Sequence, residues 1–222
     1  FELFPAGSYA TFITNHAQDR VMSTFLGSTE KAATAGSILL TGPGVPFIYY
    51  GEEIGMSGTK PDELIRTPMQ WSAEASAGFT NGRPWESVNQ DYTTVNVALE
   101  MEDPNSLLSH YRTLIHLRNN HSALRVGEYV QVRADQNQVL AFLRISQEET
   151  ILVLINLGAK DINEYSLELQ RSLLSGVYKG VLLLGAGEVI DLIVGDNGGF
   201  EDYQPVVQIP ANGTVIIQLT SR

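Results

Sequence analysis

The chain contains no cysteine, few basic residues and no long apolar run. Without cysteine, its 222 residues hold neither a disulfide framework nor a thiolate metal site, and the redox compartment stays open. Fourteen Lys and Arg against twenty-five Asp and Glu give a formal net charge of -11, which disfavours nucleic acid as a partner but not a neutral substrate. No apolar run approaches the ~20 residues that a membrane span needs, so we expect no membrane partner.

The start of the chain shows no targeting signal. Residues 1–5 have neither the basic region nor the apolar region of a signal peptide. The sequence also begins without Met and in the middle of a pattern, so we expect a piece of a longer protein, with its location open between secreted and cytoplasmic. A composition of 43% hydrophobic and 18% charged residues predicts a globular core.

An apolar stretch that ends in a polar cluster organises the first half of the chain. Residues 9–14 are aromatic, β-branched or apolar, the pattern of a buried strand. They lead directly into Asn15-His16-Ala17-Gln18-Asp19-Arg20. A strand that ends in ionisable and hydrogen-bonding side chains is typical of the active face of an α/β barrel.

A helix and a second strand follow. Residues 29–40 predict a helix with Ser28 as its cap, and the small residues Ala32, Ala35 and Gly36 would let it lie close on a sheet. Residues 45–50 predict another buried strand. Strand, helix and strand with short connections indicate a βαβ unit and therefore a parallel sheet.

A long loop and another helix complete this first part. Residues 57–96 show no sustained period and contain both tryptophans, and a loop of this length inside a compact domain is usually functional. A helix is then predicted to run to about residues 119–120, with Asp103 as its N-cap and Pro104 in its first position.

Residues 124–222 change to the pattern of an antiparallel β-sandwich. We therefore predict two domains, 1–123 and 124–222. The predicted strands are 128–133, 139–144, 151–157, 165–169, 178–184, 206–209 and 214–219.

Only two parallel strands are visible in residues 1–123, whereas a complete (β/α)8 barrel takes about 250 residues. Two strands alone would leave both edges of the sheet unpaired. The remaining strands are expected from another part of the same enzyme.

Four stretches taken in order resemble the C-terminal half of the α-amylase superfamily of retaining glycosidases. The first, residues 12–20, matches the Phe-x-x-Asn-His-Asp signature except that Ala17 stands where the family has aspartate. The other three stretches are 44–55, 60–71 and 78–85. The resemblance covers nearly the whole chain and implies an α/β plus all-β fold, namely the last two βα units of a (β/α)8 TIM barrel followed by the β-sandwich called domain C.

The resemblance implies an α-amylase-type glycoside hydrolase that cleaves α-1,4-glucosidic bonds in starch or malto-oligosaccharides. Such enzymes retain configuration through a carboxylate nucleophile and a carboxylic acid/base. Both precede this chain in the family's order, and the third catalytic aspartate is replaced by Ala17. We expect the chain to be inactive by itself. Because every neighbour of Ala17 matches the family, we favour an engineered replacement over the natural drift of a pseudoenzyme.

The same resemblance assigns substrate binding to His16, Asn15, Arg20 and Arg66. Arg66 matches a position that in exo-acting α-glucosidases of the family helps bind the non-reducing end, whereas its short distance in sequence from Ala17 is more similar to endo-acting α-amylases. From the residues alone, His16 could be a structural histidine and not a sugar-binding one. Asn15 could do no more than hold the loop. Arg20 could equally form a salt bridge to Asp19 or Glu52.

Other candidates carry simpler interpretations. Glu52 and Glu53 would point to opposite faces of an extended chain, so they form a poor catalytic pair and one is expected to support packing or an ion pair. Tyr49 and Tyr50 are predicted to lie mostly in the core. Both tryptophans, Trp71 and Trp85, could stack on sugar rings or clamp the long loop.

No cofactor and no metal site is expected in this chain, and the resemblance places any calcium in the missing N-terminal part. That part and an α-glucan are the expected partners. An exo-acting α-glucosidase, a glucosyl-transferring relative, or a non-catalytic carbohydrate-binding or accessory module remain as alternatives.

Overall fold

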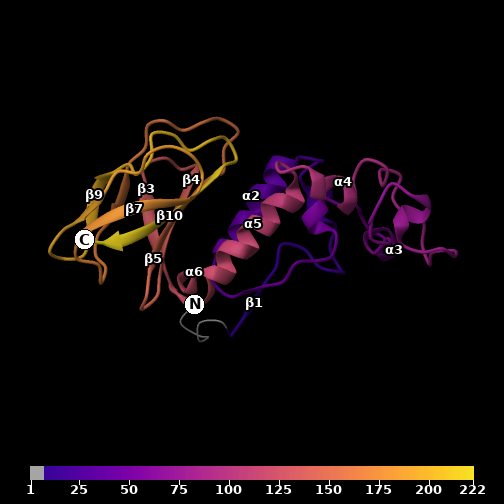
Figure 1. The fold of residues 1–222 in the computed structure, drawn as a ribbon, viewed down its shortest axis with the longest axis horizontal. Helices are drawn as coiled ribbons and strands as arrows, with labels where there is room; N and C mark the ends of the chain where they lie inside the picture. Colours follow the sequence, from indigo (N-terminus) through magenta and orange to yellow (C-terminus); the bar gives the residue numbers. More distant parts are fainter. Residues whose placement is uncertain (1–7) are drawn as a thin grey trace. The chain divides into compact units, whose positions relative to one another are not determined.

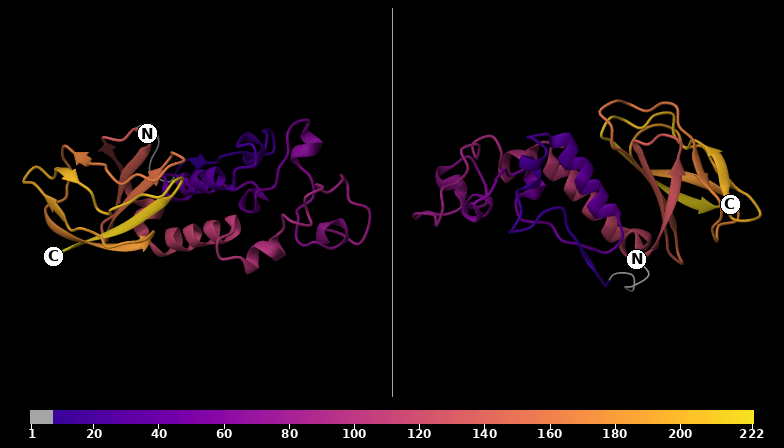
Figure 2. Two further views of the ribbon diagram at one scale, coloured as in Figure 1. Left: turned by 90° about the horizontal axis from the view of Figure 1, so that it is seen from above. Right: turned by 180° about the vertical axis from the view of Figure 1, so that it is seen from behind.

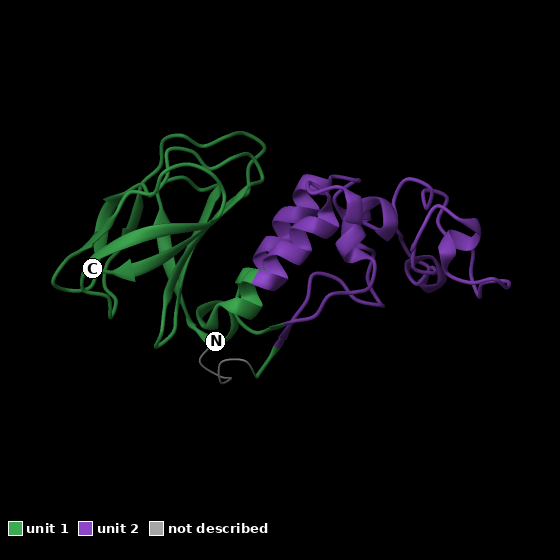
Figure 3. Cartoon of the chain, viewed as in Figure 1, with its two compact units in different colours: residues 1–9, 40–45, 117–222 green, residues 10–39, 46–116 purple. Residues whose placement is uncertain are grey.

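The structure is a computed structural model that describes residues 8–222, so residues 1–5, where no signal peptide is predicted, lie outside it. The described residues form two compact units (Figure 3). Unit 2 comprises residues 10–39 and 46–116, and unit 1 comprises residues 8–9, 40–45 and 117–222. Because these units group residues by proximity and not along the chain, the boundary at 123/124 stays a prediction.

The predicted βαβ unit is present, with shorter strands. β1 (Ala10–Thr11), α1 (Val21–Thr24), α2 (Thr29–Thr41) and β2 (Val45–Pro46) follow one another. The Val45 amide donates to the Tyr9 carbonyl, and the Phe47 amide donates to the Thr11 carbonyl. Because the residue numbers of donor and acceptor both increase by two from the first bond to the second, the two strands are parallel.

The prediction that these strands are buried is wrong for the chain as it stands. Phe12, Val45 and Phe47 are 50%, 44% and 59% exposed. Each strand has one neighbour only within the described residues, so the outer edges carry no ladder and the assigned strands are two residues long. This is the open sheet expected of an incomplete barrel.

Helix α2 lies beside α5 (Leu107–Asn120), as Figures 1 and 2 show. The small residue Gly36 faces the ring of Tyr111, and Ser37 contacts Nε2 of His110 at 2.9 Å. The predicted small face of α2 therefore packs at Gly36 against a helix. The prediction of Asp103 as N-cap is also wrong: the helix begins at Leu107, and the Ser106 hydroxyl accepts from the Ser109 amide at 3.1 Å.

Two short helices, α3 (Asp62–Ile65) and η2 (Ala75–Gly78), interrupt the long loop of residues 57–96, and η1 (Glu52–Ile54) and α4 (Val97–Glu102) flank it. The buried side chain of Gln70 joins the middle of this loop to its C-terminal end. Gln70 donates to the Val95 carbonyl at 2.5 Å and to Asp91 at 3.2 Å, and accepts from Asn89 at 3.2 Å. These hydrogen bonds help to define the path of a segment that has no periodicity.

Unit 1 is an antiparallel sheet that follows α6 (Ser122–Val126). Strand β3 pairs with β4 through residues 128–132 and with β6 through residues 133–134. It therefore takes part in two sheets, one that contains β4 and one that contains β6. The strand order is β8-β7-β10-β5-β4-β3-β6-β9. The strands are β3 (Glu128–Ala134), β4 (Val139–Ile145), β5 (Thr150–Asn156), β6 (Leu167–Leu169), β7 (Gly176–Leu184), β8 (Leu192–Val194), β9 (Phe200–Tyr203) and β10 (Thr214–Ser221).

Two predictions for this sheet fail. Residues 206–209 form no strand and contribute a single bridge, from Ile209 to Ile162. The short strands β8 and β9 were not predicted, because three or four residues are too few for an alternating pattern to stand out. Leu192 and Val194 of β8 and Phe200 and Tyr203 of β9 belong to the core of the unit, whereas Ile193 is exposed.

Candidate active site

The loop after β1 is held by the side chain of Asn15. Its Oδ1 accepts from the Ala17 amide at 2.8 Å, and its carbonyl accepts from the Gln18 amide at 3.2 Å. This turn within the loop leaves His16 and Ala17 exposed. Asn15 thus holds the loop, and its contact with a sugar stays a prediction, as does that of His16.

Arg66 fixes the same loop from outside. Its Nε donates to the His16 carbonyl at 2.9 Å, and its Nη2 pairs with Asp62 at 2.6 Å. The guanidinium therefore joins Asp62, the first residue of α3, to the segment that carries His16 and Ala17. Arg66 is half-buried and lies beside His16, and its contact with substrate stays a prediction.

Arg20 is buried between two tyrosines. Its guanidinium carbon lies 4.7 Å from the ring centroids of both Tyr49 and Tyr50, and Nη1 donates to the Tyr50 carbonyl at 2.7 Å. Burial lowers the pKa of Arg20. Only 1% of Arg20 is exposed, so in this structure it supports the site from behind, and any contact with sugar stays a prediction.

Neither salt bridge considered for Arg20 is seen among the described residues. The carboxylate of Asp19 accepts from the Lys60 amide at 2.7 Å. Tyr50 likewise differs from its predicted position in the core. It is 38% exposed, and its hydroxyl donates to the Thr67 carbonyl.

Glu52 supports packing, one of the two roles predicted for this acid pair. It accepts hydrogen bonds from the Thr14 hydroxyl at 3.0 Å and the Tyr111 hydroxyl at 3.1 Å. Burial raises the pKa of Glu52, and the two hydrogen bonds act in the opposite direction. Burial also raises the pKa of Glu53. Both residues lie in a 3-10 helix and not on an extended chain as assumed from the sequence.

Both tryptophans line one pocket of unit 2. The pocket has a volume of about 370 Å³, and its aromatic lining consists of Tyr50, Trp71, Phe79 and Trp85. Arg66 also lines it, so the pocket adjoins the loop that carries His16 and Ala17. Sequence analysis missed Tyr50 and Phe79 as pocket residues; the available signal for Tyr50 was its place at the carboxyl end of a predicted barrel strand.

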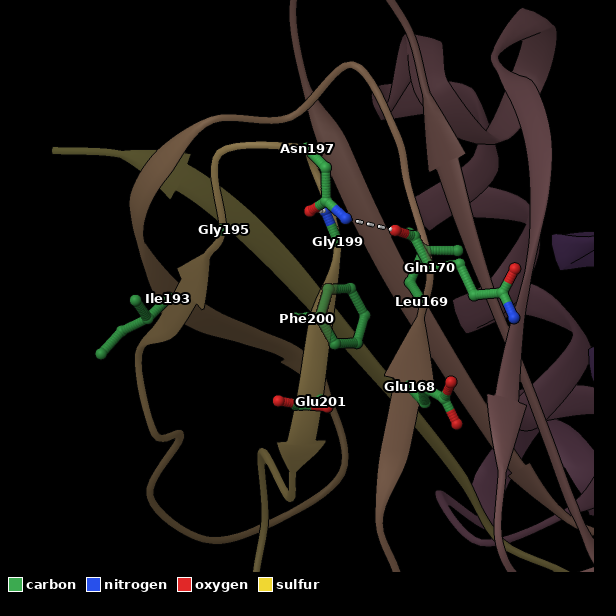
Figure 4. A pocket seen from close by; sticks show the side chains of 9 residues that line it. All are labelled: Glu168, Leu169, Gln170, Ile193, Gly195, Asn197, Gly199, Phe200 and Glu201. Carbon is green, nitrogen blue, oxygen red and sulfur yellow. Dashed lines mark hydrogen bonds between the residues drawn. The ribbon is translucent and has the colours of Figure 1, made fainter.

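Unit 1 has a separate pocket of about 390 Å³ lined by residues of β6, β8, β9 and the turn between β8 and β9 (Figure 4). Asn197 donates to the Gln170 carbonyl at 2.9 Å across it. Of its two carboxylates, Glu168 pairs with Arg133 at 3.4 Å, and Glu201 is exposed. The pocket shares no residue with the site around Ala17.

The part of the chain that the structure describes contains no group of three or more His, Cys, Asp or Glu placed to hold a metal ion. Among the same residues no helix is both long and apolar enough to cross a membrane. The sequence-based expectations about calcium, cofactors and partners stay predictions.

Comparison with known proteins decides the family. The family model of the alpha-amylase catalytic domain matches residues 3–127, more than half of the chain. The chain belongs to the alpha-amylase family.

Two curated relatives illustrate the similarity. Alpha-amylase 3 of Dictyoglomus thermophilum is 40% identical over 149 residues, which cover 67% of this chain and 30% of the relative. An oligo-1,6-glucosidase of Halalkalibacterium halodurans is 32% identical over 190 residues, covering 68% of this chain and 34% of that protein. The chain thus spans about a third of the length of the curated relatives that it matches.

Solved structures support the fold over both units. The alpha-amylase from H. orenii superposes with a TM-score of 0.73 and 34% identity, over 95% of this chain and 39% of that one. A trehalose-6-phosphate hydrolase of Bacillus licheniformis gives a TM-score of 0.70 and 25% identity, over 96% of this chain and 43% of that one. The predicted fold class, the end of a (β/α)8 barrel followed by a β-sandwich, is confirmed.

Proposed function

We propose that this chain is the C-terminal portion of a retaining glycoside hydrolase that acts on the α-1,4-glucosidic bonds of starch or malto-oligosaccharides. The observation that carries the proposal is the loop after β1, where Asn15 and Arg66 hold His16 and Ala17 in an exposed turn. An imidazole presented at the carboxyl end of a barrel strand is well placed to donate a hydrogen bond to a sugar hydroxyl. Family membership supports the same reaction class.

In this proposal the chain is catalytically incomplete. A retaining mechanism needs one carboxylate to attack the anomeric carbon and a second to protonate the leaving oxygen. Both would come from the N-terminal part of the enzyme. Ala17 occupies the position of the family's third aspartate, and its methyl group cannot accept hydrogen bonds from the sugar. We favour an engineered change at this position.

The open strands support the N-terminal part as a partner. Phe12, Val45 and Phe47 are exposed in or directly after β1 and β2, which have no outer neighbours among the described residues. Additional barrel strands would cover these side chains, as in interfaces that resemble a protein core divided in two.

The test is reversion in the presence of the rest of the barrel. Co-expression of the N-terminal part with Ala17→Asp should raise starch hydrolysis by at least about a hundred-fold over the Ala17 protein, the usual effect of one charged contact in a closed site. Ala17→Asn is the matched control, because it adds similar volume without the negative charge. Equal activity of all three proteins would contradict the proposal, and intact-mass spectrometry would establish which polypeptides are present.

Two alternatives have support of their own. Oligo-1,6-glucosidases among the relatives and the position of Arg66 favour an exo-acting α-glucosidase or glucosyl-transferring relative. Product analysis on maltoheptaose separates these, because exo action releases glucose first and transfer creates longer products. A non-catalytic carbohydrate-binding module predicts glucan binding without the N-terminal part and no hydrolysis with it.

A further inference from the structure

The carboxyl group of Glu52 joins three elements of unit 2 at one buried point. Its Oε2 accepts from the Thr14 hydroxyl at 3.0 Å, and its Oε1 accepts from the Tyr111 hydroxyl at 3.1 Å. Thr14 follows β1, Glu52 begins η1 after β2, and Tyr111 lies in α5. Glu52 is 2% exposed and Thr14 is also buried, so water does not compete for either hydrogen bond.

This carboxyl group is buried without a cation. Within the part of the chain that the structure describes, Glu52 forms no ion pair, and Glu53 brings a like charge close to it. Such burial is costly, and an apolar side chain of similar volume often serves stability better. Packing alone therefore does not account for an acid here. Both oxygens of a carboxylate accept hydrogen bonds, which lets Glu52 bind two hydroxyl groups at once.

One of these two hydroxyl groups belongs to a residue that is fixed by packing. Tyr111 is buried, and its ring lies against Gly36 of α2 with no room for a side chain between them. The Tyr111 hydroxyl therefore holds Oε1 of Glu52 in one place. The other carboxylate oxygen, Oε2, is then a fixed acceptor for the Thr14 hydroxyl.

The other hydroxyl group belongs to the residue at which the candidate-site loop begins. Thr14 directly precedes Asn15 and His16 in the chain. The Asn15 turn and the hydrogen bond from Arg66 to the His16 carbonyl restrain later residues of this loop. The hydrogen bond from Thr14 to Glu52 restrains its beginning, and through Tyr111 it connects that end of the loop to α5.

We propose that Glu52 is a positioning residue for the candidate active site. By binding Thr14 from a base that is fixed on α5, it sets the point at which the loop that carries His16 leaves β1. Glu52 itself is too deeply buried to touch a substrate. The link to catalysis rests on the proposed function, because the orientation of His16 affects the reaction only if that residue contacts the sugar.

Two changes at Thr14 separate positioning from packing. Thr14→Val keeps the shape of the side chain and removes the hydroxyl, whereas Thr14→Ser keeps the hydroxyl and removes the methyl group. In the full chain, hydrogen exchange at the amides of Ala17 and Gln18 should be about three- to ten-fold faster in Thr14→Val, the effect of one lost hydrogen bond, and nearly unchanged in Thr14→Ser. The reverse order would show that Thr14 acts through packing and would overturn the proposal, as would equal exchange in both variants.

Tyr111→Phe tests the base on α5, because it removes the hydroxyl and keeps the ring. Exchange at the same two amides should again become faster, and the double variant with Thr14→Val should exchange no faster than Thr14→Val alone, since both changes break one bridge. Thr93→Val, at an exposed position of the long loop, is the matched control and should leave this exchange unchanged. Tyr111→Phe carries the test if Thr14→Val fails to fold by circular dichroism, and unaltered exchange in folded Tyr111→Phe would overturn the proposal.

Activity gives a second measurement and separates this inference from the proposed function. In the Ala17→Asp protein with its N-terminal part, Thr14→Val should lower kcat for starch by about ten-fold and change KM by less than about two-fold, because lost orientation raises the barrier more than it weakens binding. Hydrolysis together with unchanged exchange in Thr14→Val would contradict the positioning role alone. Exchange that depends on the Thr14 hydroxyl, without any hydrolysis, would contradict the proposed function and retain the restraint on the loop.

Discussion

The ring of Tyr111 lies directly against the α-carbon of Gly36. A methyl group added at Gly36 would lie 2.7 Å from the ring atom Cε2 of Tyr111 and 2.8 Å from Cζ. The Tyr111 hydroxyl is in turn bonded to Glu52 at 3.1 Å, so the ring cannot move without breaking a buried hydrogen bond. The close approach of α2 and α5 depends on the absence of a side chain at Gly36.

Gly36→Ala should therefore destabilise the protein although alanine favours helices. Overpacking of this kind costs about 1–3 kcal/mol in free energy of unfolding. Gly82→Ala is the matched control, since the nearest atom to its added methyl group lies 3.7 Å away. Urea unfolding measures both, and equal stability of the two variants would contradict the packing described for Tyr111.

Arg118 binds carbonyl groups in the last turn of α2 and just beyond its C-terminal end. It is 7% exposed and donates to the carbonyls of Leu40 at 2.8 Å and Gly42 at 3.0 Å, with a third hydrogen bond to Gly44. Arg118→Lys keeps the charge but cannot reach three acceptors in one plane. We expect the free energy of unfolding to fall by about 1–3 kcal/mol, which is the cost of a buried acceptor left unpaired.

The control for this change is Arg112→Lys, an exposed position on the same helix. Thermal unfolding should leave that variant near the unaltered protein. A similar small effect of both substitutions would mean that the carbonyls of α2 are satisfied without Arg118.

The ionised Glu149 carboxylate should stabilise unit 1, and this stabilisation should be lost in acid. Burial acts to raise the pKa of Glu149, but hydrogen bonds from His121, the Ala123 amide and Ser122 outweigh it and hold the pKa below its ordinary value of 4.5. Because the folded pKa is depressed, the stabilisation is present above pH 4.5 and is lost as the pH falls through the lower folded value.

Glu149→Gln should remove this acid-dependent part. Its free energy of unfolding should be lower than that of the unaltered chain at pH 6 and should fall less steeply below pH 4.5. Glu148→Gln, an exposed neighbour, should retain the steep dependence. Parallel pH profiles of all three proteins would show that the hydrogen bonds to Glu149 contribute no net stability.

Arg66 should restrain the loop at the candidate site. Replacing it by glutamine removes the hydrogen bond to the His16 carbonyl, so hydrogen exchange of the amides at residues 16–18 should become faster, by about three- to ten-fold for one lost hydrogen bond. Lys60→Gln removes a different, exposed partner of Asp62 and should leave this exchange rate unchanged. Slow exchange in both variants would show that the Asn15 turn suffices.

Much of this protein follows from local pattern. Periodicity predicted α2, the parallel order of β1 and β2, and most strands of unit 1, because the alternation of apolar residues depends on neighbours within a few positions of the chain. The resemblance around Asn15 and His16 predicted the family, since a rare combination of residues carries that information without any knowledge of packing.

Only the tertiary structure decided how separated side chains meet. No local pattern indicated that Arg20 would lie between Tyr49 and Tyr50, or that Trp71 and Trp85 would line one pocket. It indicated Asp103 where Ser106 caps α5, because several polar residues there are equally able to cap a helix. Local propensity favours types of structure, whereas long-range packing selects among side chains that suit the same position equally well.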